Sequence, residues 1–190
     1  MVVERMGCTD VTEFFLPGDL ERLGKDAMME AVEAADVLVF TTPTYCMRCS
    51  SHMKRFMEAT FRYWLPHRPR GCMFSKRAAV IATAAGAGER DAVKDITNML
   101  FWWGVPRTEG YGVALFADGW EDIAPDKMAS IERNADRIAS RLMKGRPSVG
   151  LRTRMAFAFI RKMHADGNGV PSDTEYWKEQ GWLEKGRPWD

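Results

Sequence analysis

The chain has 190 residues, of which 46% are hydrophobic and 28% charged, and its formal net charge is +1. This length corresponds to one domain with a full core, and the near-neutral charge indicates neither a nucleic acid nor an anionic membrane as partner. No apolar run approaches the ~20 residues that a membrane-spanning helix needs, and the first residues lack the apolar segment of a secretory signal. Four cysteines without such a signal predict a protein of the reducing cytoplasm.

The first part of the chain predicts helices and strands in alternation. Residues 1–7 are typical of the last turn of a helix that stops at a glycine. The Val, Thr and Phe content of residues 11–16 predicts a strand that ends at a Pro-Gly pair, and apolar residues at helical spacing predict a helix over about 25–35. The continuous apolar run at 37–41 is typical of a strand buried on both faces.

The rest of the chain continues this alternation. The predicted elements are a helix over about 51–64, a strand over 78–83, a helix over 89–103, a strand over 111–117, a helix from Pro125 to about Leu142, and a short apolar helix over about 151–164. Strands that alternate with helices pair in parallel through right-handed crossovers, which predicts a three-layer α/β fold with a doubly wound parallel sheet. We expect one domain over residues 1–147 and a helical, aromatic C-terminal extension over 148–190, which packs on that domain or on a partner subunit.

Three stretches carry a resemblance to a known family. They are Asp-Val-Leu-Val-Phe-Thr-Thr-Pro-Thr-Tyr at residues 36–45, Met-Lys-Arg-Phe-Met-Glu at 53–58 and Tyr-Trp-Lys-Glu-Gln-Gly-Trp-Leu at 176–183. Together they resemble the flavodoxin-like NAD(P)H-dependent FMN reductases, in which a Pro-x-Tyr loop wraps the flavin ring and a subset ends in a similar aromatic tail. The resemblance therefore implies a flavodoxin-like fold, whose five parallel strands lie in the spatial order 2-1-3-4-5.

One part of that fold is missing from the sequence. The four predicted strands correspond to the second to fifth of the family, and nothing in residues 1–20 matches the Gly-Ser-x-x-x-x-Gly-Asn-Thr-like loop that holds the FMN phosphate at a helix amino terminus. Either the chain as given starts late, or the protein lacks its first strand and has paired differently. We favour the late start, because removing a central strand exposes the edges of its neighbours.

The resemblance implies FMN as cofactor and NAD(P)H as reductant. A hydride would pass from the nicotinamide to the flavin and then to a small acceptor such as a quinone, a free flavin or a nitro compound, with the protein supplying orientation and electrostatics. It names no general acid or base, and it implies a homodimer with the flavin near the interface. The expected flavin contacts come from two loops that follow strands, namely Pro43, Thr44, Tyr45, Cys46, Met47, Thr83, Ala84, Ala85, Gly86 and Gly88. The alanines of the second loop depart from the family's run of glycines and put its shape in doubt.

Other interpretations of the sequence stay open at this point. Without its phosphate loop, the chain could be a flavodoxin-like interaction or structural module that has lost FMN binding. Cys46 and Cys49 precede a helix, as a redox-sensing pair would. A metal is not expected, because a zinc site needs four ligands and an iron–sulfur flavoprotein would carry its cysteine cluster earlier in the chain. Five basic residues predict a solvated helix face, with cofactor phosphates or a neighbouring subunit as the alternative contacts: Arg146, Arg152, Arg154, Arg161 and Lys162.

Overall fold

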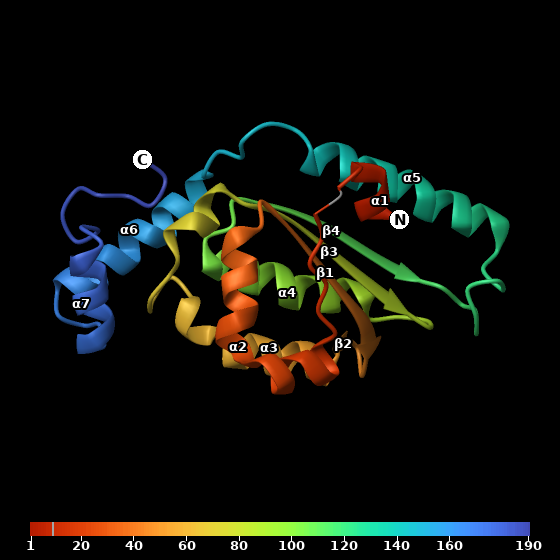
Figure 1. The fold of residues 1–190 in the computed structure, drawn as a ribbon, viewed down its shortest axis with the longest axis horizontal. Helices are drawn as coiled ribbons and strands as arrows, with labels where there is room; N and C mark the ends of the chain where they lie inside the picture. The colour runs from red at the N-terminus through yellow and green to blue at the C-terminus, as the bar shows by residue number, and fades with distance from the viewer. Residues whose placement is uncertain (9) are drawn as a thin grey trace.

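The computed structural model describes residues 1–8 and 10–190 and has three layers, with a sheet between two groups of helices (Figure 1). Its long strands are β1 (Val37–Tyr45), β3 (Arg77–Ala84) and β4 (Arg107–Ala114). These strands are parallel and adjacent in the order β1-β3-β4, and the two-residue strand β2 (Arg48–Cys49) pairs antiparallel with the end of β1. The predicted α/β fold with a parallel sheet is confirmed, and the order is that of the last three strands of a flavodoxin-like sheet.

Helices cover both faces of the sheet, which explains why alternate residues of β3 are equally buried. Ala78 and Val80 pack in the cluster formed with α2 (Leu16–Ala34), α3 (Ser51–Ala59) and α4 (Glu89–Trp103), whereas Ala79 packs with α1 (Val2–Met6) and α5 (Pro125–Leu142). The 3₁₀ helices η1 (Phe61–Tyr63) and η2 (Gly71–Ser75) lie between α3 and β3. Within the described ranges, no helix combines the length and the apolar character needed to cross a bilayer.

The C-terminal helices α6 (Leu151–Ala165) and α7 (Pro171–Glu179) build a separate aromatic cluster. Phe157, Trp177 and Trp182 pack there with Leu65 and Phe74, which belong to the segment before β3. The Trp177 indole is fully buried and donates a hydrogen bond to the carbonyl oxygen of His67 at 2.9 Å. The tail therefore packs against the end of the domain at which the parallel strands begin, while the division at residue 147 stays a prediction.

The strand predicted over residues 11–16 is wrong. Residues 10–15 form neither helix nor strand, and α2 begins at Leu16. A strand needs a neighbour that completes its hydrogen bonds, so β propensity alone does not create one, and the described sheet places no strand beside this segment. Pro17 instead fits the first turn of a helix, and the Asp19 carboxylate accepts a hydrogen bond from the Phe15 amide at 2.7 Å.

Several further boundaries differ from the prediction. The helix predicted over about 25–35 begins earlier, at Leu16, and the strand predicted over 37–41 extends to Tyr45. β4 lies at 107–114 rather than 111–117. Its glycines interrupt the apolar pattern from which a strand is predicted, although the strand needs them to pack closely under α4. A Cβ on Gly110 would lie 2.8 Å from Val93, and one on Gly112 would lie 2.7 Å from Glu89. The helix predicted over 51–64 ends at Ala59, after which the chain continues as η1. In contrast, the helices over 89–103 and 125–142 match their predictions.

His164 provides a test of how the tail is held to the domain. The imidazole is only 2% exposed; its Nε2 lies 3.1 Å from the Pro66 carbonyl oxygen and its Nδ1 lies 2.8 Å from the Thr174 hydroxyl. These partners suit a neutral ring that donates at Nε2 and accepts at Nδ1. Burial lowers the pKa of His164, because removing the imidazolium from water disfavours the charged form.

We expect the free energy of unfolding to decrease as the pH falls below about 6.5, the ordinary pKa of histidine. Below that pH the histidine of the unfolded chain binds a proton. The folded imidazole has a lower pKa and binds its proton only at more acidic pH, so protonation favours the unfolded state. Urea denaturation between about pH 8 and about pH 5 measures this slope. The substitution His164→Gln should flatten the dependence of the unfolding free energy on pH, whereas the control substitution His52→Gln, at an exposed histidine, should not. Equal slopes in the two variants would contradict the assignment of this pH dependence to His164.

Candidate functional site

The first predicted loop is a tight hairpin turn at the carboxyl end of β1. Tyr45 pairs with Arg48, so Cys46 and Met47 form a two-residue connection, and both have positive φ values (49° and 66°). Two consecutive positive φ values are the geometry of a type I′ hairpin turn, which favours Asn and Gly over Cys and Met. Non-glycine residues in this conformation are strained, and such strain concentrates at functional sites. The side chains of Tyr45 and Met47 are 63% and 54% exposed.

Contacts on both sides of this turn hold it in place. The Ser50 amide donates a hydrogen bond to the hydroxyl of the buried Thr42 at 3.1 Å, and the Ser50 hydroxyl caps α3 by accepting from the Met53 amide at 3.3 Å. The Arg48 guanidinium forms an ion pair with Asp95 of α4. The turn is therefore anchored to two helices, which fixes the direction in which Tyr45 and Met47 project.

The second predicted loop, from Thr83 to Gly88, contacts the first one directly. Gly88 has a φ of 93°, and a Cβ on it would lie 2.6 Å from the Met47 Cα and 3.0 Å from the Thr44 Cγ2. Pro43 and Thr83 are register partners in the parallel ladder, so the two loops leave the sheet side by side. The two predicted groups of residues are thus adjacent in space.

The alanines of this loop do not distort it. The carbonyl oxygens of Ala84 and Ala85 accept hydrogen bonds from the amides of Leu115 and Phe116 at 2.8 and 2.9 Å. The φ values of the loop alanines are not positive, so glycine is required at Gly88 and not at the positions that depart from the family's pattern.

A third loop, which the sequence analysis did not include, reaches the same edge of the sheet. Phe116 follows β4, has a φ of 53° and is 73% exposed. Its ring lies 3.7 Å from the position of a Cβ on Gly86, and the Lys127 ammonium lies 5.1 Å from the ring centroid. The signal available in the sequence was the position of this loop after the last parallel strand, because ligands bind outside the carboxyl ends of such strands.

A cavity of about 280 Å³ lies at the ends of β1 and β3, lined by Thr41, Thr42, Pro43, Ile81 and Thr83. Of the ten predicted residues only Pro43 and Thr83 line it. The hydroxyl oxygen of Thr44, the residue after Pro43, is buried and has no hydrogen-bond partner among the described residues. A buried polar atom without a partner is rare in folded proteins and indicates a ligand or a water molecule. A cavity lined by threonine, proline and isoleucine, at a sheet edge whose loops expose Tyr45, Met47 and Phe116, has the mixture of apolar and hydroxyl groups that a flat ring with polar edges would contact.

The cysteines do not form a second chemical centre in the part of the chain described. Cys46 is exposed and Cys49 is buried, and both are free thiols. Burial and the neighbouring Asp95 carboxylate raise the pKa of Cys49, which disfavours the thiolate that a redox-active pair requires. Across residues 1–8 and 10–190, no three His, Cys, Asp or Glu side chains gather closely enough to hold a metal ion.

Comparison with known proteins identifies the family. The sequence model of the NADPH-dependent FMN reductases matches residues 12–117, which is more than half of the chain. The chain belongs to the NADPH-dependent FMN reductase family. The matched segment contains both predicted loops, and the family relationship inferred from residues 36–45 and 53–58 is confirmed. FMN and a reduced nicotinamide cofactor are the cofactors of this family, as predicted, and its members are oxidoreductases that act on small molecules.

Individual proteins are similar to this FMN reductase family member in sequence or in fold. It is 25% identical over 181 residues, 93% of this chain and 79% of the relative, to an iron-sulfur flavoprotein of Archaeoglobus fulgidus. The structure of the Trp repressor binding protein from Bacillus subtilis has a TM-score of 0.50 at 23% identity, covering 75% of this chain and 87% of that one. The apo form of an NADH:FMN oxidoreductase has a TM-score of 0.55 at 16% identity, covering 81% and 87%.

The iron–sulfur cluster in the name of the archaeal relative finds no counterpart in the described residues. Such clusters are held by four cysteine thiolates, and the four cysteines of this family member, Cys8, Cys46, Cys49 and Cys72, do not come together there. Within the described structure, these cysteines do not provide the ligand set of such a cluster. The hydroxyl and apolar side chains at the carboxyl edge of the sheet are the kinds of group that hold a flavin ring.

Proposed function

We propose that this chain binds the ring of FMN between the loops at 43–47 and 83–88 and transfers reducing equivalents from NADPH to a small acceptor. The observation that supports the proposal is the close packing of the two loops, in which Gly88 lies against Met47 and the Thr44 methyl group, beside a Thr44 hydroxyl that is buried and has no partner among the described residues. Bound FMN would accept a hydride from the nicotinamide and release electrons to the acceptor, which is chemistry that the protein orients and does not itself perform.

The role of the protein residues is positioning and exclusion of water. Pro43 and Thr83 would contact the ring, and the Thr44 hydroxyl would be available to hydrogen-bond to its polar groups. Tyr45, Met47 and Phe116 have the exposed apolar area to cover the ring and to contact a flat acceptor such as a quinone, a free flavin or a nitro compound. The five residues that line the cavity carry no titratable side chain, so the proposal needs no general acid or base from them.

A homodimer would place a second surface against the same edge. Exposed apolar side chains that gather at one place on a surface are typical of interaction sites, and Tyr45, Met47 and Phe116 do so around the proposed flavin site. We therefore propose that the partner subunit covers this edge, as the resemblance to flavin reductases implies.

The test is an absorbance spectrum of the purified chain mixed with excess FMN and then separated by gel filtration. We expect flavin absorbance to co-elute with the protein and to bleach under anaerobic conditions when NADPH is added, with the colour returning on addition of a quinone. NADH in a parallel sample measures the nicotinamide preference. A folded chain that elutes without flavin would contradict the proposal and would favour the alternative of an interaction module.

A further inference from the structure

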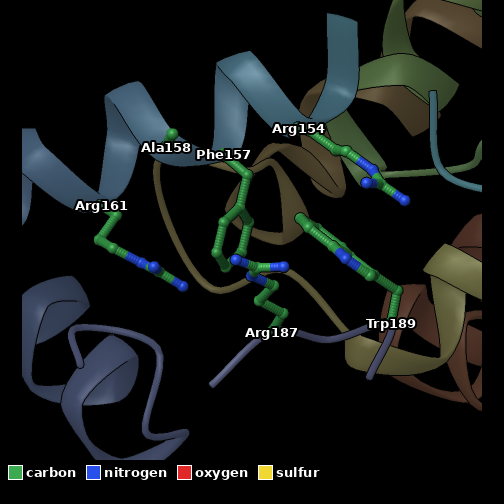
Figure 2. A pocket seen from close by; sticks show the side chains of 6 residues that line it. All are labelled: Arg154, Phe157, Ala158, Arg161, Arg187 and Trp189. Carbon is green, nitrogen blue, oxygen red and sulfur yellow. The ribbon is translucent and has the colours of Figure 1, made fainter. Parts of the chain in front are cut away.

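A second cavity lies at the other end of the molecule from the proposed flavin site. It has a volume of about 210 Å³ and lies between α6 and the last residues of the chain, lined by Arg154, Phe157, Ala158, Arg161, Arg187 and Trp189 (Figure 2). Phe157 and Trp189 also contact Phe74, which precedes β3, whereas the flavin loops follow the strands. Since β3 has eight residues and a strand rises about 3.3 Å per residue, the two sites lie at opposite ends of the sheet.

The three arginines of this cavity carry positive charge that no ion pair neutralises within the described residues. None of Arg154, Arg161 and Arg187 forms an ion pair with a carboxylate there, although arginine ion pairs occur at many other places in the protein. Burial and the neighbouring charge of Arg187 lower the pKa of Arg161, and Asp190 opposes this effect only in part. Like charges held together without a counter-charge are destabilising unless an anion joins them.

The guanidinium groups are positioned by the backbone and keep free donors. The Arg161 Nη2 donates to the Gly186 carbonyl oxygen at 2.6 Å, and the Arg154 Nε donates to the Val149 carbonyl oxygen at 2.9 Å. The Arg161 Nε is buried, with no hydrogen-bond partner in the described structure. Figure 2 shows Arg187 extending from the C-terminal segment into the space between Arg161 and Trp189. Oriented guanidinium donors are thus present without acceptors.

We propose that this cavity binds a phosphoryl group, with Arg161 and Arg187 as its ligands and Trp189 and Phe157 as the apolar wall for the group that carries the phosphate. Guanidinium groups recognise phosphate by paired, charge-assisted hydrogen bonds, and a doubly charged phosphate balances more of the cluster than a carboxylate does. The cavity volume is below that of sites for drug-sized molecules, which suits a phosphate with a small part of its ester.

The phosphate could belong to a soluble ester or to a lipid headgroup, and α6 itself offers an observation on this choice. Leu151, Met155 and Phe159, spaced four residues apart on its outward side, are 74%, 63% and 70% exposed. An apolar stripe with basic residues at its edges is typical of helices that lie on an anionic membrane surface. The experiment therefore has one part for each source.

The first part is titration calorimetry of the full chain with inorganic phosphate at constant ionic strength, which removes general screening as an explanation. We expect saturable binding that Arg187→Gln weakens at least about tenfold, since each charged hydrogen bond contributes substantially to such sites. The matched control is Lys162→Gln, which removes one charge from α6 outside the cavity, where Lys162 pairs with Asp166. Absence of binding, or an equal loss in the control, would overturn the proposal.

Arg161→Gln provides an independent variant, to be checked by near-ultraviolet circular dichroism because Arg161 also contacts Gly186. The second part is sedimentation with vesicles of phosphatidylcholine, with and without phosphatidic acid. If the chain binds the acidic vesicles and Arg187→Gln abolishes this binding, the result would support the site and identify a lipid headgroup as the source of the phosphate. Phosphate binding without vesicle binding would support it with a soluble phosphate ester.

Discussion

Replacing Gly88 with alanine is expected to weaken FMN binding by at least about tenfold, equivalent to about 1.4 kcal/mol, and to lower the free energy of unfolding by about 1–3 kcal/mol. The backbone at Gly88 has a φ of 93°, which alanine adopts only with strain. The added methyl group would lie 2.6 Å from the Met47 Cα. Backbone cannot rotate out of the way as a side chain can, so the two flavin loops would have to separate.

Fluorescence titration of FMN and urea denaturation measure the two effects. The matched control is Gly86→Ala in the same loop, where φ is not positive and the nearest atom to the new Cβ is a ring carbon of Phe116 at 3.7 Å. This control should change stability and FMN affinity little. If Gly88→Ala binds FMN as tightly as the unaltered chain, the loops at 43–47 and 83–88 do not hold the flavin together, and the proposed site is wrong.

Replacing Trp177 with alanine is expected to lower the free energy of unfolding by about 3–5 kcal/mol, the range for deleting a large buried aromatic side chain. Trp177 is fully buried, and its ring centroid lies 4.8 Å from that of Phe157, 5.1 Å from that of His164 and 5.4 Å from that of Trp182. The substitution also leaves the His67 carbonyl oxygen without the indole donor. Both effects would detach α7 from the domain.

Thermal and urea unfolding measure this change, with Trp120→Ala as the control because that side chain is 55% exposed. The control should shift stability by no more than about 0.5 kcal/mol. Because Trp177 packs at the end of the sheet away from the flavin loops, FMN affinity of the folded variant should be unchanged. A Trp177→Ala protein as stable as the control would contradict the view that the aromatic cluster anchors the tail.

The elements that the sequence predicted correctly are those whose signal is local. The helix over 89–103 has its apolar residues on one face and Gly104 as its C-terminal cap at a φ of 93°, so periodicity and a single glycine define it. The helix over 125–142 begins at Pro125, as the preference of proline for the first turn predicts. The strands β1 and β3 were found from continuous apolar runs, because a strand covered on both faces has no polar side.

The errors arose where the outcome depends on a distant neighbour. Residues 11–16 have a composition typical of strands but no strand beside them in the described sheet. β1 continues past Pro43 to Tyr45. The short strand β2 pairs with β1 only at residues 44 and 45, so no hydrogen bond to β2 requires the backbone amide that Pro43 lacks. β4 was placed too late because its glycines pack under α4 and carry no apolar signal.

For the site, the sequence by itself determined the family, the two loops and the edge of the sheet at which they meet, because parallel strands bring their carboxyl ends to one edge. Only the tertiary structure decided how the loops touch, through Gly88 against Met47, that Phe116 joins them, and that Thr44 has no partner. It also brought Arg187 to the same cavity as Arg154 and Arg161, which the sequence analysis predicted only as part of a solvated basic helix face. Loop geometry and charge clusters depend on contacts between residues far apart in the chain, and the pattern of neighbouring residues does not contain them.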